Sequence, residues 1–348
     1  MLRNGRLYQL SLNAPANSKG SCNRQDQQIK SSKGVSSTCR WQRATTTIRR
    51  PTARGSCCNP TFNQLELIFF LQTTLDYLFS TILESTDDLY ATHAFIRDRT
   101  RSIRQDFTVQ NYRGREAVDC HERIARYHIL CLHMLCDNPN FSEQQEMEQL
   151  RKVLQSLMEF YKDTKMSSSP IPSPNEAEFR AYYALVFLRD HDVTRQLQTL
   201  PEDIFFSRPM ARSLRLRSLA QRSNDKFVQN NAEAAPNSFS RFFKEVQRSA
   251  TYLESCVLEI WFGSVRTGAL KALRQALGVK AVQVAQVPLF ILVKILGFDD
   301  IGQLIALCDY LNLEIVDDDE GSPKSVWFKR SSPWEGCPLH SFIFDSLC

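Results

Sequence analysis

The stretch FIRDRTRSIRQDFTVQN, residues 95–111, combines the spacing of an amphipathic helix with an unusual density of arginine. Three apolar residues recur at intervals of seven and four, so they share one helix face: Ile96, Ile103 and Phe107. Four arginines fall within residues 97–104: Arg97, Arg99, Arg101 and Arg104. The sequence therefore predicts a helix that buries one side in a core and carries guanidinium groups on the rest of its surface.

These arginines allow two interpretations. Exposed charge is the ordinary condition of a helix surface, and Asp98, one turn before Arg101, offers part of that charge a partner within the helix. Guanidinium groups also match carboxylate and phosphate oxygens two at a time, which suits a docking site for an acidic partner. On the second interpretation, all four arginines of residues 97–104 are candidate partner-binding residues.

Charge along the chain separates a basic N-terminal segment from a mildly acidic remainder. The 348 residues carry 43 Lys and Arg against 38 Asp and Glu, a net charge of +5. Residues 1–60 hold eleven of the basic residues and one acid, Asp26, which leaves 32 basic and 37 acidic residues for the remainder. The net charge of the chain is therefore a poor guide to nucleic-acid binding by its folded part.

Residues 1–60 are rich in Ser, Thr, Arg, Gln and Asn and have no amphipathic period. That composition predicts a disordered basic tail, which could act as a nuclear import signal or contact nucleic acid loosely. A wrongly assigned gene start is an alternative that the composition leaves open. A second, short tail is expected at residues 334–348.

The eleven cysteines have no regular spacing. Five of them fall in apolar helical patterns, as free buried thiols do in a reducing compartment: Cys120, Cys131, Cys136, Cys256 and Cys308. The N-terminal sequence MLRNGRLYQLSL lacks the apolar run of a signal peptide, and the run from Leu67 to Leu71 is too short to span a membrane. We therefore expect a nuclear or cytosolic protein without membrane insertion.

Helical periodicity dominates the chain from residue 61 onward, and no strand pattern appears before about residue 280. The joins between the predicted helices are short, which predicts a mainly α fold with an α-solenoid of helix pairs over residues 61–262. Three further helices are expected at residues 267–277, 288–296 and 301–311. Two alternating segments, 313–316 and 325–329, flank the polar loop DDDEGSPK and resemble a two-stranded wing.

Three helices and a wing are the parts of a winged-helix module, which we place at residues 263–333. Its basic residues are candidates for contact with nucleic-acid phosphates: Arg266, Lys271, Arg274, Lys324, Lys329 and Arg330. Residues 207–226 add six more Lys and Arg. Trp327 and Phe328 offer aromatic surface to a protein partner, and the acidic loop from Asp317 to Glu320 would repel phosphates. We expect protein contact to be the main role of this module and nucleic acid a secondary one.

Catalytic motifs of the GxSxG, Walker and GxGxxG types do not occur in the sequence. Residues 275–281, QALGVKA, resemble an acetyl-CoA loop only faintly, because no strand precedes them. His121 and Glu122 begin like a zincin motif, but the next histidine follows after seven residues rather than four. His128 and Cys131 share a helix face and supply only two ligands. We therefore predict no enzymatic activity, metal, cofactor or small-molecule substrate.

Three separated blocks closely resemble the Sac-three/GANP family: FIRDRTRSIRQDFTVQNY (95–112), EAVDCHERIARYHILCLHML (116–135) and SPNEAEFRAYYAL (173–185). The resemblance runs from about residue 75 to about residue 345. Members of that family are large scaffolds of the nuclear transcription-and-export complex, which couples mRNA production to export at nuclear pores. A helical-repeat domain that ends in a winged helix is called a PCI domain, and the resemblance implies the same fold.

The resemblance also implies partners and a location. It implies pairing with a second PCI-domain protein and with the small acidic Sem/DSS protein, and shared binding of mRNA or other single-stranded nucleic acid. It places the protein in the nucleus, at the nuclear envelope or the nuclear pore. The alternative is a PCI-type subunit of a proteasome-lid or initiation-factor-like assembly, with no nucleic-acid role.

Overall fold

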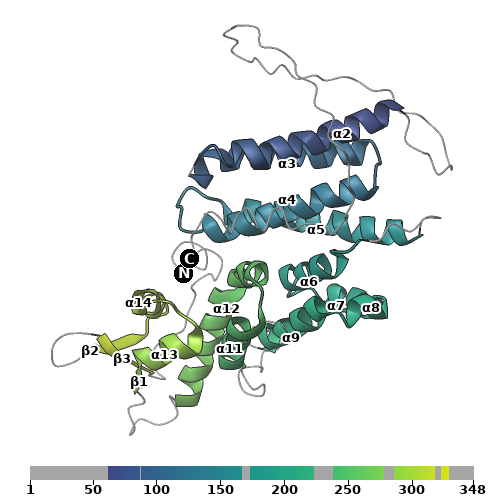
Figure 1. Ribbon diagram of the computed structural model, residues 1–348. Helices are drawn as coiled ribbons and strands as arrows, with labels where there is room; N and C mark the ends of the chain where they lie inside the picture. The colour runs from purple at the N-terminus through teal and green to yellow at the C-terminus, as the bar shows by residue number, and fades with distance from the viewer. Residues whose placement is uncertain are drawn as a thin grey trace.

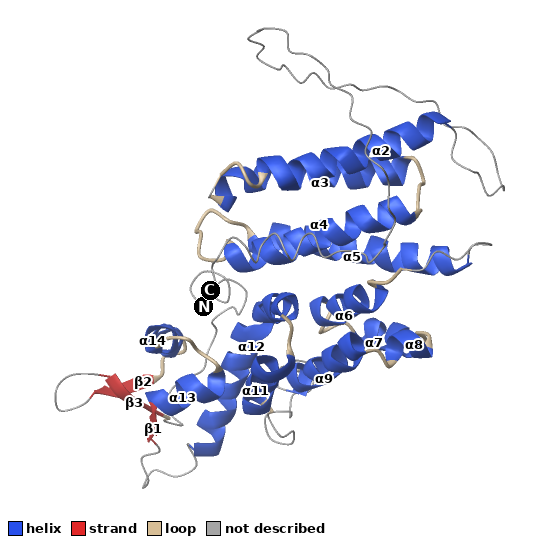
Figure 2. Ribbon diagram, viewed as in Figure 1, coloured by secondary structure: helices blue, strands red, loops and turns tan. Residues whose placement is uncertain are grey.

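The computed structural model describes residues 62–86, 88–166, 173–222, 238–277, 286–317 and 323–328. Over these residues the chain is mainly helical, as predicted, with a small sheet near its C-terminal end (Figures 1 and 2). The two predicted tails, 1–60 and 334–348, lie outside the described residues.

The first group of helices forms a layer at the top of Figure 1. Its elements are α2 (Phe62–Tyr77), the π-helical segment η1 (Leu78–Ile82), α3 (Leu89–Val109), α4 (Arg115–Met134) and α5 (Glu143–Met166). The second group lies below it: α6 (Glu176–Val186), α7 (His191–Gln198), α8 (Glu202–Phe205), α9 (Arg208–Arg222), α11 (Phe239–Ser249) and α12 (Tyr252–Leu277). Helix α12 packs against both α4 and α6, and so joins the two groups.

Helix α4 is the central element of the first core, because α2, α3, α5 and α12 all pack against it. It buries polar as well as apolar side chains, and hydrogen bonds join several of the polar ones to neighbouring helices. Glu122 accepts hydrogen bonds from Tyr161 Oη at 2.6 Å and from Asn175 Nδ2 at 2.7 Å. Arg126 donates from Nε and Nη2 to the two carboxylate oxygens of Glu178, at 3.2 and 2.9 Å. These polar links fix α5 and α6 against α4.

Helix α3 has the amphipathic character that its sequence predicts. Ile96, Ile103 and Phe107 are at most 3% exposed. The helix begins six residues before the quoted stretch, where the Asp88 side chain accepts a hydrogen bond from the backbone N–H of Tyr90 at 2.9 Å. It ends at Val109, and Asn111 then adopts a left-handed backbone conformation with φ of 50°, which lets the chain turn toward α4.

The C-terminal unit consists of the last turns of α12, two helices and a sheet: β1 (Gln286–Pro288), α13 (Leu289–Leu296), α14 (Ile301–Tyr310), β2 (Glu314–Asp317) and β3 (Pro323–Trp327). The antiparallel sheet has the order β1-β3-β2. Central Val326 lies opposite Val287 on one side and Ile315 on the other. Both predicted wing segments are therefore strands, whereas β1, only three residues long, was not predicted.

A second hydrophobic core fills this unit and is separate from the first. The boundary predicted at residues 262/263 falls within α12, which continues without a break for 26 residues. Val265 belongs to the first core, while Ala269 and Leu270 belong to the second. The separate helix expected at residues 267–277 is therefore the end of α12, because the change of pattern near residue 265 marks a change of packing partner.

The span Leu65–Ile82 in α2 and η1 is long and apolar enough to cross a membrane, although only by length and composition. The prediction of no membrane insertion considered only the uninterrupted run at residues 67–71. The longer span includes Glu66 and Asp76, and 28% of it is buried within the protein. Five of its side chains lie in the first core: Ile68, Leu71, Leu75, Leu78 and Phe79. Four aromatic or aliphatic side chains remain exposed: Leu65, Phe69, Phe70 and Tyr77.

Candidate protein and nucleic-acid interfaces

Arg97 and Arg101 of α3 form a surface with Gln145 at the start of α5, which we call the arginine face, and Arg104 and Gln149 lie next to it. Arg97 Nη1 donates to Gln145 Oε1 at 3.1 Å, and Arg104 Nη2 donates to Gln149 Oε1 at 2.6 Å. Both partners are neutral amides, so these hydrogen bonds orient the guanidinium groups without cancelling their charge. The exposed Arg101 lies between them in the sequence of α3.

Two of the four arginines differ from the sequence-based interpretation. Arg99 pairs with Asp98 at 2.6 Å, so the acid expected to serve Arg101 is bound to its direct neighbour in sequence. Arg104 is only 9% exposed, which corrects its assignment as an open contact residue. Burial, and then the charge of Arg101, lower the pKa of Arg104 to about 10. Its guanidinium therefore remains charged at neutral pH and lies beneath the arginine face.

Arg266, a predicted phosphate contact, is instead part of the fold. It is 5% exposed, and it donates from Nε to Leu296 O at 3.2 Å and from Nη2 to Gly297 O at 2.6 Å. Its guanidinium also lies over the Phe298 ring, 3.9 Å from the ring centre. These carbonyls belong to the C-terminal end of α13, which has no helical partners for them. Arg266 therefore ties α12 to α13 and is unavailable to phosphate.

The other candidate contact residues in the C-terminal unit fall into two groups, those that are buried and those that reach the surface. Arg274 is 9% exposed and Phe328 is 2% exposed, so both are corrected from surface to core residues. Phe328 is buried because strand alternation puts it on the same face as Val326. Trp327, between them, is partly exposed. Two cationic candidates keep exposed surface: Lys324 is exposed and Lys271 is partly exposed. Lys329 and Arg330 lie outside the described residues.

Two arginines of α9, expected to add basic surface, instead serve the fold. Arg212 forms two hydrogen bonds with the buried carboxylate of Glu254 in α12, at 2.7 and 2.8 Å. Arg217 is 3% exposed and donates to the carbonyls of Phe187 and Asp190, just beyond α6, at 2.7 Å each. Arg217 therefore has the same structural role as Arg266: its buried guanidinium donates to backbone carbonyls at the end of a helix.

A buried polar cluster joins α3, α4 and α5 beneath the arginine face. Glu146, fully buried, accepts hydrogen bonds from His93 Nε2 at 3.0 Å and from His128 Nδ1 at 2.6 Å. Burial alone would raise the pKa of Glu146, but the two imidazoles outweigh it and lower the pKa to about 2. His93 and Glu146 were not predicted to lie beside His128 and Cys131, because they are far from them in sequence. In the sequence, His93 and Glu146 stand out only as polar residues at positions where the helical spacing predicts apolar ones.

Comparison with known proteins places the chain in a family. A model of the SAC3/GANP family matches residues 31–317, so it begins earlier and ends sooner than the resemblance estimated from the three blocks. The protein "SAC3 family protein 1" of Schizosaccharomyces pombe is 49% identical over 272 residues, which cover 76% of this chain and 26% of that protein.

Two further relatives come from a plant and an insect. "SAC3 family protein B" of Arabidopsis thaliana is 30% identical over 217 residues, 60% of this chain and 12% of the relative. "Protein xmas" of Drosophila melanogaster is 29% identical over 225 residues, 64% of this chain and 10% of the relative. The matches thus span about a quarter or less of each relative. The family match covers most of the chain, including the arginine face, and shows that the chain belongs to the SAC3/GANP family.

Proposed function

We propose that this protein is a non-enzymatic scaffold of a nuclear mRNA-export complex. On this proposal it works in the nucleus, at the nuclear envelope or pore, and couples transcription to export. Membership of the SAC3/GANP family supports this role. The observation that carries it is the arginine face, where Arg97 is held by the neutral side chain of Gln145 and Arg101 is exposed. An ordered surface of guanidinium groups suits an acidic partner such as the Sem/DSS protein.

The proposed fold is an α-solenoid that ends in a winged helix, a PCI-like arrangement. Its support is the sequence of elements: stacked helices, then the end of α12, α13, α14 and an antiparallel three-stranded sheet. The proposed pairing with a second PCI-domain protein uses the C-terminal unit. Phe290 is 68% exposed and Ile291 is 39% exposed at the start of α13, immediately after β1, and Trp327 lies on β3 opposite β1. Exposed aromatic and aliphatic residues of this kind are typical of protein interfaces.

Nucleic-acid binding is proposed as a shared, secondary activity of the assembled complex. Its support within the described residues is limited to Lys271 and Lys324, because the burial of Arg266 and Arg274 removes two of the predicted phosphate contacts. The same observation favours a second candidate function, a PCI-type subunit of a proteasome-lid or initiation-factor-like assembly that binds no nucleic acid.

Affinity purification of the tagged full chain from nuclear extract separates the two candidates. The export scaffold should co-purify, in salt that preserves complexes, with a PCI-domain protein, the small acidic protein, export factors and RNA. Treatment with ribonuclease should release the RNA and leave the protein partners bound. Recovery of proteasome-lid or initiation-factor subunits, with no export factor, would instead establish the second function.

A further inference from the structure

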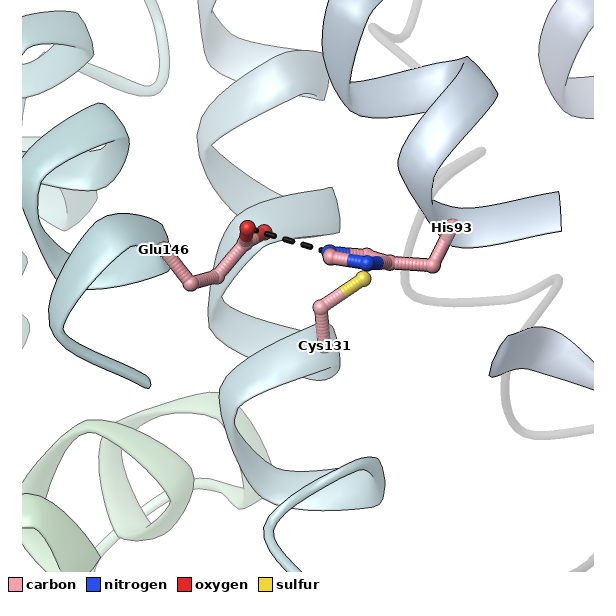
Figure 3. Close-up of side chains that lie close together, drawn as sticks. All are labelled: His93, Cys131 and Glu146. Atoms are coloured by element: carbon pink, nitrogen blue, oxygen red, sulfur yellow. Dashed lines mark hydrogen bonds and ion pairs between the residues drawn. The ribbon is translucent and has the colours of Figure 1, made fainter. Parts of the chain in front are cut away.

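The buried cluster beneath the arginine face contains a set of metal-ligating atoms. His93 of α3, Cys131 of α4 and Glu146 of α5 each offer one donor atom, and these atoms lie within 4.8 Å of one another. Figure 3 shows the three side chains converging on one point from three helices. The residues are 4%, 0% and 0% exposed. We propose that His93, Cys131 and Glu146 bind a zinc ion that fastens α3, α4 and α5 together.

The chemistry of the donors selects the metal. Zinc takes thiolate, imidazole and carboxylate ligands at roughly 2.0–2.3 Å, which puts the donors of a tetrahedral site about 3.3–3.7 Å apart. The donors here lie within 4.8 Å of one another, so binding requires side-chain rotations that move the widest pair by on the order of 1 Å. Calcium and magnesium prefer all-oxygen sites, and a mixed set with one thiolate and one imidazole suits zinc.

Charge around the cluster is compatible with a bound cation. Glu146 is fully buried and is hydrogen-bonded to His93 and His128. A zinc ion with one carboxylate and one thiolate forms a neutral unit, the charge state that a buried site favours.

Neighbouring groups already hold the ligands in place. His128 Nδ1 donates to Glu146 Oε1 at 2.6 Å, which fixes the carboxylate and directs Oε2 toward His93, 3.0 Å away. The ring of Phe141 packs edge-on against His93, with ring centres 5.2 Å apart. Such supporting contacts are usual around metal ligands, and their loss typically weakens binding about 10–100-fold. His128 is therefore a positioning residue for the site.

Zinc binding requires that Cys131 lose its proton. Burial raises the pKa of this thiol well above 9, so in the metal-free protein it is S–H. On binding, the S–H bond breaks, a Zn–S bond forms, and the proton leaves to solvent; no oxidant or reductant is needed. His93 ligates through a ring nitrogen that carries no proton, so if Nε2 is the ligand the proton that it donates to Glu146 moves to Nδ1. Affinity for zinc should therefore increase with pH. The sequence-based expectation of no metal rested on the helix that carries His128 and Cys131, which supplies too few ligands by itself.

The experiment uses the purified full chain and two metals. Elemental analysis should find stoichiometric zinc after gel filtration, and removing it with a chelator should lower the melting temperature. Cobalt added to the metal-free chain should give the near-ultraviolet band of a thiolate–cobalt bond. Cys131→Ser should abolish that band, and His128→Ala should weaken cobalt binding about 10–100-fold.

Cys120→Ser is the matched control, because Cys120 lies in the same helix, is equally buried and is absent from the cluster. It should leave zinc content and the cobalt band unchanged. The zinc content and cobalt spectrum of the wild-type chain test the proposal even if Cys131→Ser does not fold. A folded wild-type chain that holds no zinc and gives no thiolate–cobalt band would overturn the proposal, and His93, Glu146 and His128 would then form a metal-free hydrogen-bond network. A band that persists in a folded Cys131→Ser chain would also overturn it.

Discussion

At the scale of the residue, the arginines of this chain have two kinds of environment. Arg217 and Arg266 are buried, and each donates to the backbone carbonyls that follow a helix. Arg97 and Arg104 are oriented by glutamine side chains, and of the two only Arg97 reaches the surface. Sequence patterns do not distinguish these environments, because both occur on helices at the same spacing. The distinction depends on which helix end lies opposite the guanidinium group.

The arginine face should be required for binding an acidic partner. We expect Arg97→Glu with Arg101→Glu to weaken that binding about 100-fold, roughly 3 kcal/mol, because two attractions become repulsions. Isothermal titration with the purified acidic protein measures the change. Arg99→Glu is the control, since Arg99 already pairs with Asp98. If the double variant melts like wild type and keeps all its partners, the arginine face is only a solvated surface.

Arg266 should contribute to stability rather than to binding. We expect Arg266→Met to lower the free energy of unfolding by about 3 kcal/mol, because it leaves the carbonyls of Leu296 and Gly297 without their donor. Urea denaturation gives the value directly. Lys244→Met, at an exposed position on α11, should change the free energy by less than about 0.5 kcal/mol. Equal effects of the two substitutions would contradict a structural role for Arg266.

His121 should make the protein less stable in mild acid. Its Nδ1 lies 2.7 Å from Ala117 O, and burial, with a smaller contribution from Arg104, lowers its pKa from 6.5 to about 3. The unfolded chain therefore binds a proton below pH 6.5 that the folded chain rejects, so stability falls as pH decreases from 6.5 toward 3. From pH 7 to 5.5 we expect His121 to account for a loss of about 1.2 kcal/mol.

Urea unfolding at the two pH values tests this expectation. His121→Leu should be less sensitive to the same acidification by about that amount, although the substitution lowers stability at neutral pH by removing a buried hydrogen bond. The comparison isolates one residue, because His93 and His128 are present in both proteins. An identical pH dependence of wild type and variant would show that His121 is not the group responsible.

At the scale of the element, amphipathic periodicity predicted the helices well and their ends less well. The stripe of α3 and the strands β2 and β3 could be identified because alternation of apolar residues reflects which side is buried. The length of α12 could not, because Gly263 and Gly268 lie where its packing partner changes and the pattern there resembles a helix boundary, whereas the helix continues through both glycines. The cluster of His93 and Glu146 was missed for a related reason: residues 53 apart in sequence become neighbours only when α3 and α5 pack.

The helical cysteines should all be reduced. Four of the five candidates are buried, and burial raises the pKa of Cys120, Cys256 and Cys308 to about 12, which suppresses their reactivity in the folded state. Thiol titration in denaturant and chelator, without reductant, should therefore detect the five as free thiols once the chain unfolds. Peptide mapping that finds disulfides among them would contradict the expected reducing compartment.

At the scale of the whole molecule, nucleic-acid binding should belong to the assembly. Lys271 and Lys324 offer few phosphate contacts, so the isolated chain should bind single-stranded RNA weakly, at about micromolar affinity or worse. In the assembled complex, Lys271→Glu with Lys324→Glu should lower affinity and reduce the salt slope by about 0.7 per lost contact. Sequence preference should not change, because phosphates carry no base information.

Fluorescence anisotropy of labelled RNA across a salt series measures both quantities. Lys244→Glu, a single charge reversal at an exposed position on α11, is the surface control for the two reversals in the C-terminal unit. Superimposable curves for wild-type and doubly substituted complexes would mean that the C-terminal unit serves protein pairing alone. The PCI-type subunit without a nucleic-acid role would then be the better account of the protein.

The continuity of α12 has a mechanical consequence. Its 26 residues form a rod about 39 Å long at 1.5 Å per residue, and its two ends are embedded in different cores. A rod held at both ends transmits force and rotation, whereas a loop at the same place would absorb them. A force applied to the sheet is therefore transmitted to α4 through α12. Two partners bound at opposite ends of the protein are held at a constant distance from each other.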